Sequence, residues 1–265
     1  MALSKGVKKR IWFYGGLLCG IVGFYFYQPI RIDFFAKPVP VPNPPVDPDS
    51  RDLFSKGATV LVVTAHPDDS EYYLGPFLLS LAKAGATIDL VVCTDGDKSY
   101  YPWQNGGEMR QIRRGEQLAA AKVWHGSNVE FLGFPDGRLH PNSDVIAAIH
   151  GRIERYRPGW LITFDGDYPP KVSHGDHRSA GQAAAKAAEG TPVRYEMLFA
   201  TRVPNYVADT SSFEDQEKSL LALHASEFTG AKLDRVNDTV QNDASDEAEN
   251  TKFTFGCAFR CVKLN

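Results

Sequence analysis

The 265-residue chain has few cysteines, no large excess of charge of either sign and no internal repeat. Its four cysteines include no C-x-x-C pair and form no disulfide framework, which argues against a cysteine zinc site. The formal net charge of −3 is unlike the basic excess of nucleic-acid-binding proteins, so no nucleic-acid partner is expected. With 43% hydrophobic and 23% charged residues, the chain has the composition of a globular protein with a substantial core.

The first 28 residues differ from the rest of the chain. Residues 11–27 carry no charge, and as a helix they would extend over about 25 Å, the short end of a membrane span. No small-x-small cleavage site follows this apolar segment, which disfavours a cleaved signal peptide. We therefore expect residues 1–28 to form a single N-terminal membrane helix that is retained as an anchor.

Basic residues are more frequent before this apolar segment than after it. The positive-inside bias therefore places the N-terminus in the cytoplasm and the following domain on the non-cytoplasmic side. Residues 29–56 contain six prolines between positions 38 and 48, which favours an extended polyproline II spacer. A disordered linker would have nearly the same consequence, since either would separate the domain from the membrane.

Residues 57–265 are expected to form one domain in which strands and helices alternate. Apolar, strand-like runs occur at 58–65, 87–94, 128–134 and 159–164, and helical patterns occur at 72–85, 107–124, 143–158 and 177–190. This alternation indicates a Rossmann-like α/β fold, with a mostly parallel sheet and helices on both faces. Further along, we expect a strand at 193–200, a helix at 213–226, a polar loop at 234–250 and a strand at 253–264.

Two motifs rich in histidine and aspartate follow strands of this predicted sheet. His66-Pro67-Asp68-Asp69 comes directly after the first strand, and His174-Gly175-Asp176-His177 lies beyond the fourth. A strand-to-helix junction would explain the proline and one capping acid, but not two acids and a histidine. Because ligands bind at the carboxyl ends of strands in open α/β sheets, both motifs are candidates for a single site.

The side-chain chemistry of these motifs is that of a catalytic zinc site. His66, Asp69 and His177 would bind the ion and leave one position open for water. Asp68 need not be a ligand and could act as the general base that takes a proton from this water. This division explains two adjacent aspartates, because the metal would neutralise one of them.

The motifs AHPDDSE, TDGD, RRGEQLAAAKV, FPDGRL and HGDH resemble, in this order, the PIG-L/LmbE family of zinc-dependent de-N-acetylases over roughly residues 58–190. The resemblance implies a Rossmann-like domain that uses Zn²⁺ or another divalent metal such as Fe²⁺. It implies hydrolysis of the N-acetyl group of a GlcNAc-containing conjugate, with release of acetate and a free amino sugar. The substrate would be a small-molecule or lipid-linked acetylated amino sugar.

The resemblance also implies roles for individual residues. The family's metal ligands correspond to His66, Asp69 and His177, and its base corresponds to Asp68. His174 resembles the histidine that stabilises the oxyanion or the leaving group. Asp176 would orient His174, while Arg113 and Asp136 resemble substrate-contacting residues. The other four histidines stand alone and are expected to be surface or packing residues: His125, His140, His150 and His224.

Two further functions remain open. The first is an N-acetylglucosaminylphosphatidylinositol de-N-acetylase proper, which the membrane helix favours, although the HGDH motif has a bacterial form. The second is a membrane-tethered sugar-binding protein without turnover. That alternative predicts damage to the base or to the metal ligands, and all of these residues are present.

Overall fold

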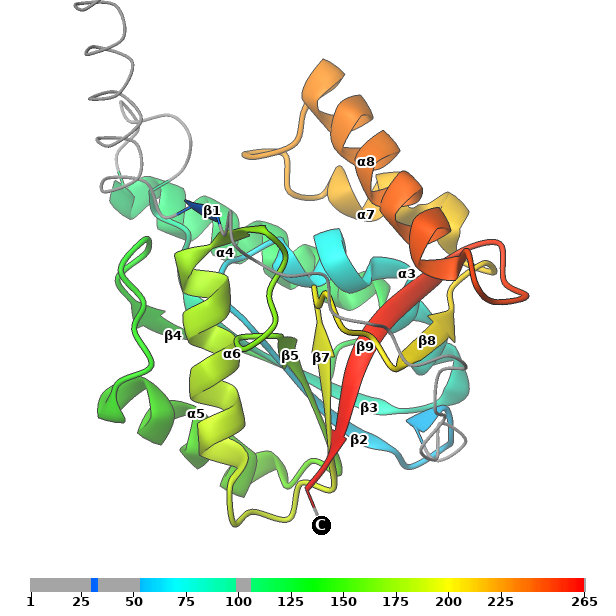
Figure 1. The fold of residues 1–265 in the computed structure, drawn as a ribbon. Helices are drawn as coiled ribbons and strands as arrows, with labels where there is room; N and C mark the ends of the chain where they lie inside the picture. The colour runs from blue at the N-terminus through cyan, green and yellow to red at the C-terminus, as the bar shows by residue number, and fades with distance from the viewer. Residues whose placement is uncertain (1–29, 33–52, 99–105, 265) are drawn as a thin grey trace, which may run out of the picture.

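The computed structural model describes residues 30–32, 53–98 and 106–264, which form an α/β fold with a central sheet between layers of helices (Figure 1). The strands are β1 (Ile30–Ile32), β2 (Thr59–Thr64), β3 (Thr87–Thr94), β4 (Asn128–Phe134), β5 (Trp160–Phe164), β6 (Val172–His174), β7 (Tyr195–Phe199), β8 (Tyr206–Asp209) and β9 (Gly256–Lys263). The helices are α3 (Asp69–Ala84), α4 (Gly106–Val123), α5 (Ser143–Tyr156), α6 (Gly175–Ala188), α7 (Glu217–Leu221) and α8 (Gly230–Ala248), with a short 3-10 helix η1 (Glu214–Gln216).

The main sheet has seven strands in the order β4-β3-β2-β5-β7-β9-β8. The first five in this order pair in parallel, and β9 is antiparallel to both of its neighbours. A separate two-stranded sheet pairs β1 with β6. The carboxyl ends of the five parallel strands therefore meet at one edge of the sheet, where both histidine motifs were expected.

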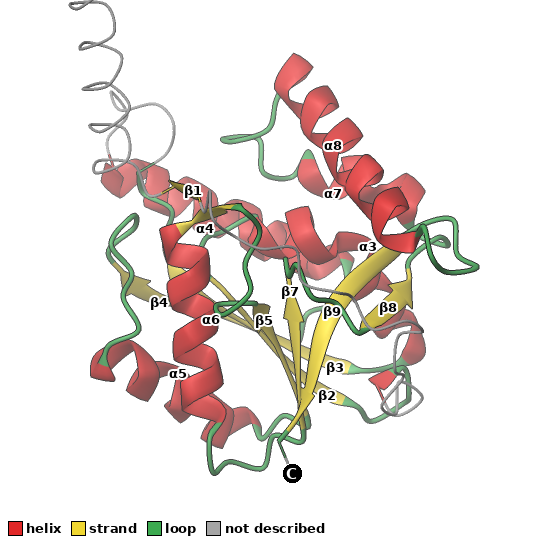
Figure 2. Cartoon of the chain, viewed as in Figure 1, coloured by secondary structure: helices red, strands yellow, loops and turns green. Residues whose placement is uncertain are grey.

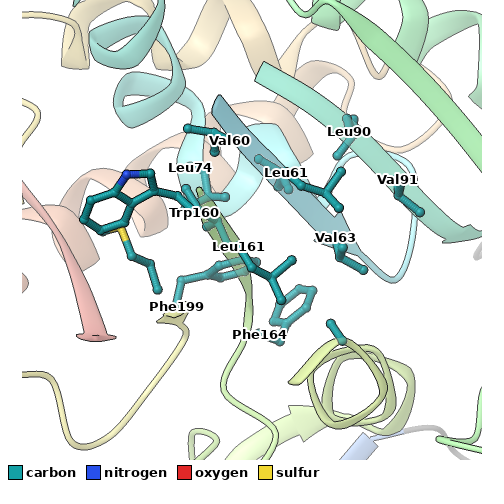
Figure 3. Close-up of a cluster of buried hydrophobic side chains, with 14 of the residues drawn as sticks. Val60, Leu61, Val63, Leu74, Leu90, Val91, Trp160, Leu161, Phe164 and Phe199 are labelled. Carbon is teal, nitrogen blue, oxygen red and sulfur yellow. The ribbon is translucent and has the colours of Figure 1, made fainter. Parts of the chain in front are cut away.

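Helices cover both faces of the main sheet (Figure 2). Helices α5 and α6 pack against each other and contact β3, β2 and β5, while α3 and α4 contact β2, β3, β9 and β4. Because both faces are covered, β2 and β5 are apolar along nearly their whole length. The buried side chains of these strands pack with Leu74 and Phe199 into a single core (Figure 3). The prediction of a mostly parallel sheet with helices on both faces is confirmed.

Every strand and helix expected between residues 57 and 190 is present within a few residues of its predicted bounds. Helix α6 begins at Gly175, two residues before the predicted start, because His174 is its N-cap and accepts a hydrogen bond from the backbone N–H of Asp176. The predicted strands near the C-terminus are present as β7 and β9. Cys257 and Cys261 both lie in β9 as free thiols, as their spacing required.

Two predictions for the C-terminal region are wrong. The polar segment 234–250 was expected to be a loop but lies mostly in α8. Only three residues of this helix are buried, so the narrow buried stripe left almost no apolar periodicity to detect. The helix expected at 213–226 is reduced to η1 and α7, which ends at Leu221. Beyond it the chain turns, so that His224 contacts Glu71 and Ser226 contacts Glu116.

The predicted membrane helix and most of the predicted linker lie outside the described residues. Within the three described ranges, no helix is long and apolar enough to cross a membrane. Residues 30–32 of the predicted linker form β1, which pairs antiparallel with β6 so that Ile30 lies opposite His174. The division into anchor (1–28), linker (29–56) and domain (57–265) therefore remains a prediction.

Close packing of α6 on β5 makes Gly181 a sensitive position. A Cβ added at Gly181 would clash with the backbone carbonyl of Phe164, whereas a Cβ at Gly151 on α5 would meet nothing within 4 Å. We expect Gly181→Ala to lower the free energy of unfolding by roughly 1–3 kcal/mol through overpacking. The matched control Gly151→Ala should raise it by up to about 1 kcal/mol, because alanine favours helix. Urea unfolding of both variants tests this, and equal effects would contradict the packing argument.

Candidate metal centre

The loop that links β2 to α3 directs two adjacent carboxylates to different places. The Asp69 carboxylate turns back and accepts hydrogen bonds from the backbone N–H groups of Ala65 (3.0 Å) and His66 (2.8 Å). The backbone of Asp68 has a φ of 100°, a left-handed conformation that is uncommon for a residue other than glycine. Such backbone strain is found preferentially at functional sites. Asp68 and Asp69 thus have separate partners although they are neighbours in sequence.

Three histidines from two segments of the chain meet beside Asp69. Ligand nitrogens of His66, His174 and His177 all lie within 4.8 Å of one another, so this group could hold a metal ion. The Asp69 carboxylate contacts two of the three rings, at 3.1 Å from Nε2 of His177 and 3.7 Å from Nδ1 of His66. The His177 ring is held by Phe164, which stacks on it with a centroid distance of 4.1 Å. All three predicted ligands are therefore together at the sheet edge.

Two further acids support His66 from its other side. Its Nε2 lies 3.2 Å from a carboxylate oxygen of Asp136 and 3.3 Å from one of Asp176. Metal-ligating histidines commonly donate their second ring N–H to a carboxylate, which fixes the orientation of the ring. This arrangement leaves Nδ1, on the side of Asp69, as the ligand atom. The residues present thus fit a divalent metal such as zinc.

His174 differs from the other two histidines because its Nδ1 is already occupied. The backbone N–H of Asp176 donates to this nitrogen at 3.1 Å, so the neutral ring carries its proton on Nε2. Burial, together with the charges of His66 and His177, lowers the pKa of His174 to about 4, which keeps the ring neutral. With its proton on Nε2, His174 is a hydrogen-bond donor toward the site. This state favours Asp69 over His174 as the third ligand.

Asp176 was predicted to orient His174, and its backbone N–H donates to Nδ1 of that ring. Its carboxylate instead accepts hydrogen bonds from the backbone N–H groups of Gly137 (2.7 Å) and Leu139 (3.0 Å), and it contacts His66. The segment after β4 is thereby tied to the start of α6. That tie also places Asp136 against His66.

The Asp68 carboxylate lies apart from the histidines and contacts Arg113, whose Nη2 donates to it at 2.7 Å. Burial raises the pKa of Asp68 to about 7, with a contribution from Asp69, although the charge of Arg113 opposes the rise. The pKa of Asp69 is held well below its usual value by His177 and His66, which together outweigh burial. Neighbouring carboxyls whose environments push their pKa values apart are typical of separate acid–base roles.

The two predicted substrate-contacting residues are both directed inward. Arg113 is only 6% exposed and donates to the carbonyls of Pro67 and Gly96, and it also pairs with Glu227 at 3.1 Å. Asp136 accepts a hydrogen bond from the backbone N–H of Lys98 at 2.8 Å and contacts His66. In the structure both residues position the site, and their contact with substrate remains a prediction.

A buried hydrogen-bond network that was not predicted from sequence supports the loop between β2 and α3. Gln117 accepts from the backbone N–H of Asp68 at 2.9 Å and donates to Glu71. Glu71 is fully buried, accepts from Trp124 Nε1 at 2.8 Å and pairs with Nε2 of His224 at 2.8 Å. His224 was expected to be a surface or packing residue, and it is buried within this network. It lies 153 residues beyond Glu71, in a segment without any recognisable motif, so no sequence signal joined the two.

Arg113 pairs with two largely buried acids, Asp68 and Glu227. Replacing it by methionine would leave Asp68 without this cation and Glu227 with Lys232 alone, at 3.4 Å, so we expect a loss of about 3–5 kcal/mol in the free energy of unfolding. The control Arg155→Met removes an exposed pair with Glu130 and should cost no more than about 1 kcal/mol. Denaturant unfolding measures the free energy of both variants. A loss below about 1 kcal/mol for Arg113→Met would mean that other groups or solvent compensate the charges of the two acids.

Comparison with known proteins agrees with this geometry. The family model for PIG-L, described as GlcNAc-PI de-N-acetylase, matches residues 61–188. A 1D-myo-inositol 2-acetamido-2-deoxy-alpha-D-glucopyranoside deacetylase from Streptomyces avermitilis is 26% identical over 234 residues, which cover 73% of this chain and 77% of that protein. A probable N-acetylglucosaminyl-phosphatidylinositol de-N-acetylase from Schizosaccharomyces pombe is 30% identical over 142 residues, or 51% of this chain and 53% of the relative.

Among solved structures, the N,N'-diacetylchitobiose deacetylase from Pyrococcus horikoshii superposes with a TM-score of 0.74 at 21% identity, covering 80% of this chain and 86% of that one. At this identity the likeness shows the shared fold. The family match spans both histidine motifs, whose side chains converge on one group of ligand atoms. The resemblance to the PIG-L family of de-N-acetylases that was drawn from the motifs is thereby confirmed over residues 61–188.

Proposed function

We propose that this protein is a metal-dependent deacetylase that hydrolyses the N-acetyl group of a GlcNAc-containing conjugate. Water adds to the amide carbon, the C–N bond breaks, and the products are acetate and a free amino sugar. The observation that carries this proposal is the convergence of His66, Asp69 and His177 beside a separately held Asp68. The relatives are named for the deacetylation of GlcNAc conjugates of inositol, which supports the substrate class.

We propose that His66, Asp69 and His177 hold the ion, which is zinc or another divalent metal such as Fe²⁺. A metal bound there would supply Lewis acidity, polarising the amide carbonyl and lowering the pKa of water. The carboxylates of Asp136 and Asp176 would keep Nε2 of His66 protonated and its ring oriented. The charge of Asp69 would be largely neutralised, which removes its repulsion of Asp68.

Asp68 is the proposed general base. Its left-handed backbone turns its carboxylate away from Asp69, and Arg113 holds one of its oxygens at 2.7 Å. The other oxygen is then available to accept the proton of the attacking water. Among the described residues the Asp68 carboxylate pairs with Arg113 and belongs to neither group that could hold a metal, so it can take this proton without serving as a ligand.

His174 is proposed to act on the charge that develops later in the reaction. Since its Nδ1 accepts from the backbone of Asp176, its Nε2–H is directed to other groups at the site. A fixed donor of this kind stabilises an oxyanion or a departing nitrogen without reorganisation at the moment of reaction. Asp176 is the positioning residue for this ring.

A direct test measures acetate release from a GlcNAc–inositol conjugate by the purified protein, together with its metal content. We expect turnover that scales with bound metal, is lost on chelation and returns when zinc is added. Tight binding of the conjugate without acetate release, in protein fully loaded with metal, would instead support the alternative of a sugar-binding protein without turnover.

We also propose that residues 1–28 anchor the domain to a membrane on its non-cytoplasmic side, as their composition suggests. Deleting residues 2–28 should release the protein from the membrane fraction and leave turnover of a soluble substrate unchanged. The deletion stops before β1, because this strand pairs with β6 next to His174. Fractionation and acetate release measure the two effects, and a truncated protein still found in membranes would refute the anchor.

A further inference from the structure

Two hollows, a larger and a smaller one, lie near the metal centre. The larger is a cavity of about 260 Å³ between α3, α8 and the start of β9. The smaller hollow contains His177, and the two share three lining residues: Tyr73, Pro170 and Ala200. The ring of Tyr73 stands edge-on to that of His177, with centroids 5.8 Å apart. A molecule whose reacting group lies at His177 could therefore extend past Tyr73 into the larger cavity.

The cavity has carboxylates and aromatic rings on its walls but no cation. Its acids come from the C-terminal segment of the chain: Glu214, Glu217, Asp243, Asp246 and Glu247. Aromatic rings from α3 and β7 form the opposite side, among them Tyr72, Phe77 and Phe199. Among the described residues that line this cavity there is no lysine, arginine or histidine.

Two of these acids lack the partners that buried carboxyls normally have. Glu217 is only 2% exposed, and neither of its carboxyl oxygens has a hydrogen-bond partner among the described residues. Glu214 is 4% exposed and has one such oxygen. Burial raises the pKa of Glu214 to about 7. Since buried polar groups are nearly always hydrogen-bonded, unpartnered carboxyls beside a cavity point to a ligand that brings its own donors.

We propose that this cavity is the subsite for the part of the conjugate beyond the acetylated sugar, and that it selects an uncharged polyhydroxyl ring over a phosphate-bearing group. The inference rests on the proposed deacetylase function and narrows its substrate. Hydroxyl groups donate to carboxylates, and the apolar face of such a ring packs against aromatic side chains. A phosphate would meet the charges of the exposed acids Asp243 and Asp246 without a cation among the described lining residues, and juxtaposed like charges are how a site rejects a wrong partner.

The size of the cavity agrees with this assignment. Its volume is below the roughly 300–1,000 Å³ of pockets that enclose drug-sized ligands, so it suits a single ring rather than a lipid. The two kinds of conjugate named for the relatives differ in this respect. The Streptomyces avermitilis enzyme acts on an inositol glucosaminide without phosphate, whereas the Schizosaccharomyces pombe relative is named for a phosphatidylinositol conjugate. The size of the cavity favours the conjugate without phosphate.

The test uses two soluble substrates that differ by one group: N-acetylglucosaminyl-inositol and the same compound with a phosphate on the inositol. We expect kcat/KM to be higher for the first by roughly tenfold or more, and the ratio to shrink in high salt. The variant D243N/D246N, which removes two charges from the cavity wall, should narrow the ratio. The control Asp238→Asn removes a charge from the same helix away from the cavity and should leave the ratio as in the wild type.

Equal kcat/KM for the two substrates, or an unchanged ratio in D243N/D246N, would overturn the proposal. Faster hydrolysis of the phosphorylated compound would also overturn the proposal. The contradiction would be strongest if this faster hydrolysis disappeared in Arg178→Ala, because Arg178 lines the smaller hollow. Calorimetric binding of both compounds to the metal-loaded protein separates this inference from the proposed function. A tenfold binding preference without any acetate release would sustain the subsite and reject the deacetylase, whereas equal binding would reject the subsite.

Discussion

Replacing Asp68 by asparagine is expected to lower turnover by roughly 10²–10⁴-fold, the usual contribution of a general base, while the metal content stays that of the wild type. Asparagine keeps the shape of aspartate and can still hydrogen-bond, but it cannot accept the proton of water. Asp68 contacts Arg113 rather than the histidines, so the ligand group should be unaffected. Acetate release and metal content, measured on the same preparation, report the two quantities separately.

Asp69→Asn is the matched variant, with the same chemical change one residue away. It should lose metal affinity first, because a neutral amide is a poorer zinc ligand than a carboxylate and because Asp69 contacts both His66 and His177. Turnover would then recover in part at high zinc concentration. Near-native turnover in Asp68→Asn would exclude Asp68 as the base. Loss of metal from Asp68→Asn but not from Asp69→Asn would mean that the two roles are reversed.

Removing His66 should be the most damaging single change at the site. His66 belongs to two groups that could hold a metal, one with His174 and His177 and the other with Asp136 and Asp176. Its ring also contacts Asp69. We expect His66→Ala to retain no metal after dialysis and to show only background turnover. His177→Ala should behave in the same way, since its ring contacts Asp69 at 3.1 Å. Metal analysis and acetate release measure both effects, and full metal occupancy in either variant would refute its assignment as a ligand.

His174→Ala distinguishes two ligand sets. If Asp69 is the third ligand, this variant keeps its metal and loses turnover, because only the donor to the developing charge is missing. If it loses metal as completely as His66→Ala does, the three histidines form the ligand set and Asp69 supports them. His140→Ala serves as the control, because His140 is exposed and lies in neither metal-ligating group.

The order of elements was predictable from the sequence because local physics determines it. Runs such as 58–65 and 159–164 are apolar at nearly every position, as strands covered on both faces usually are, and glycines or polar turns separate them from the helices. The same reasoning failed for α8. That helix buries only Asn237, Val240 and Ala248, and a largely polar helix has no apolar period to detect.

The residues that meet at the site were also predictable, since the parallel topology brings the carboxyl ends of the strands to one edge. His66, Asp69 and His177 are found together, and Asp68 is found apart from the rings. Their precise relations were not predictable. That Arg113 holds Asp68, and that Asp176 contacts His66 through its carboxylate and His174 through its backbone, depends on side-chain directions that spacing in sequence does not encode.

The sequence by itself determined the alternation of strands and helices, the resemblance to the PIG-L family, and the two motifs that supply the proposed metal-ligating and catalytic side chains. Only the tertiary structure decided what surrounds them. Glu71 and His224 form a buried pair across 153 residues, and Glu227 reaches Arg113 from the same distant segment. The acids of the cavity beside Tyr73 likewise come from η1, α7 and α8. Contacts between segments so far apart depend on how the chain packs around its core, and no local pattern of residues records them.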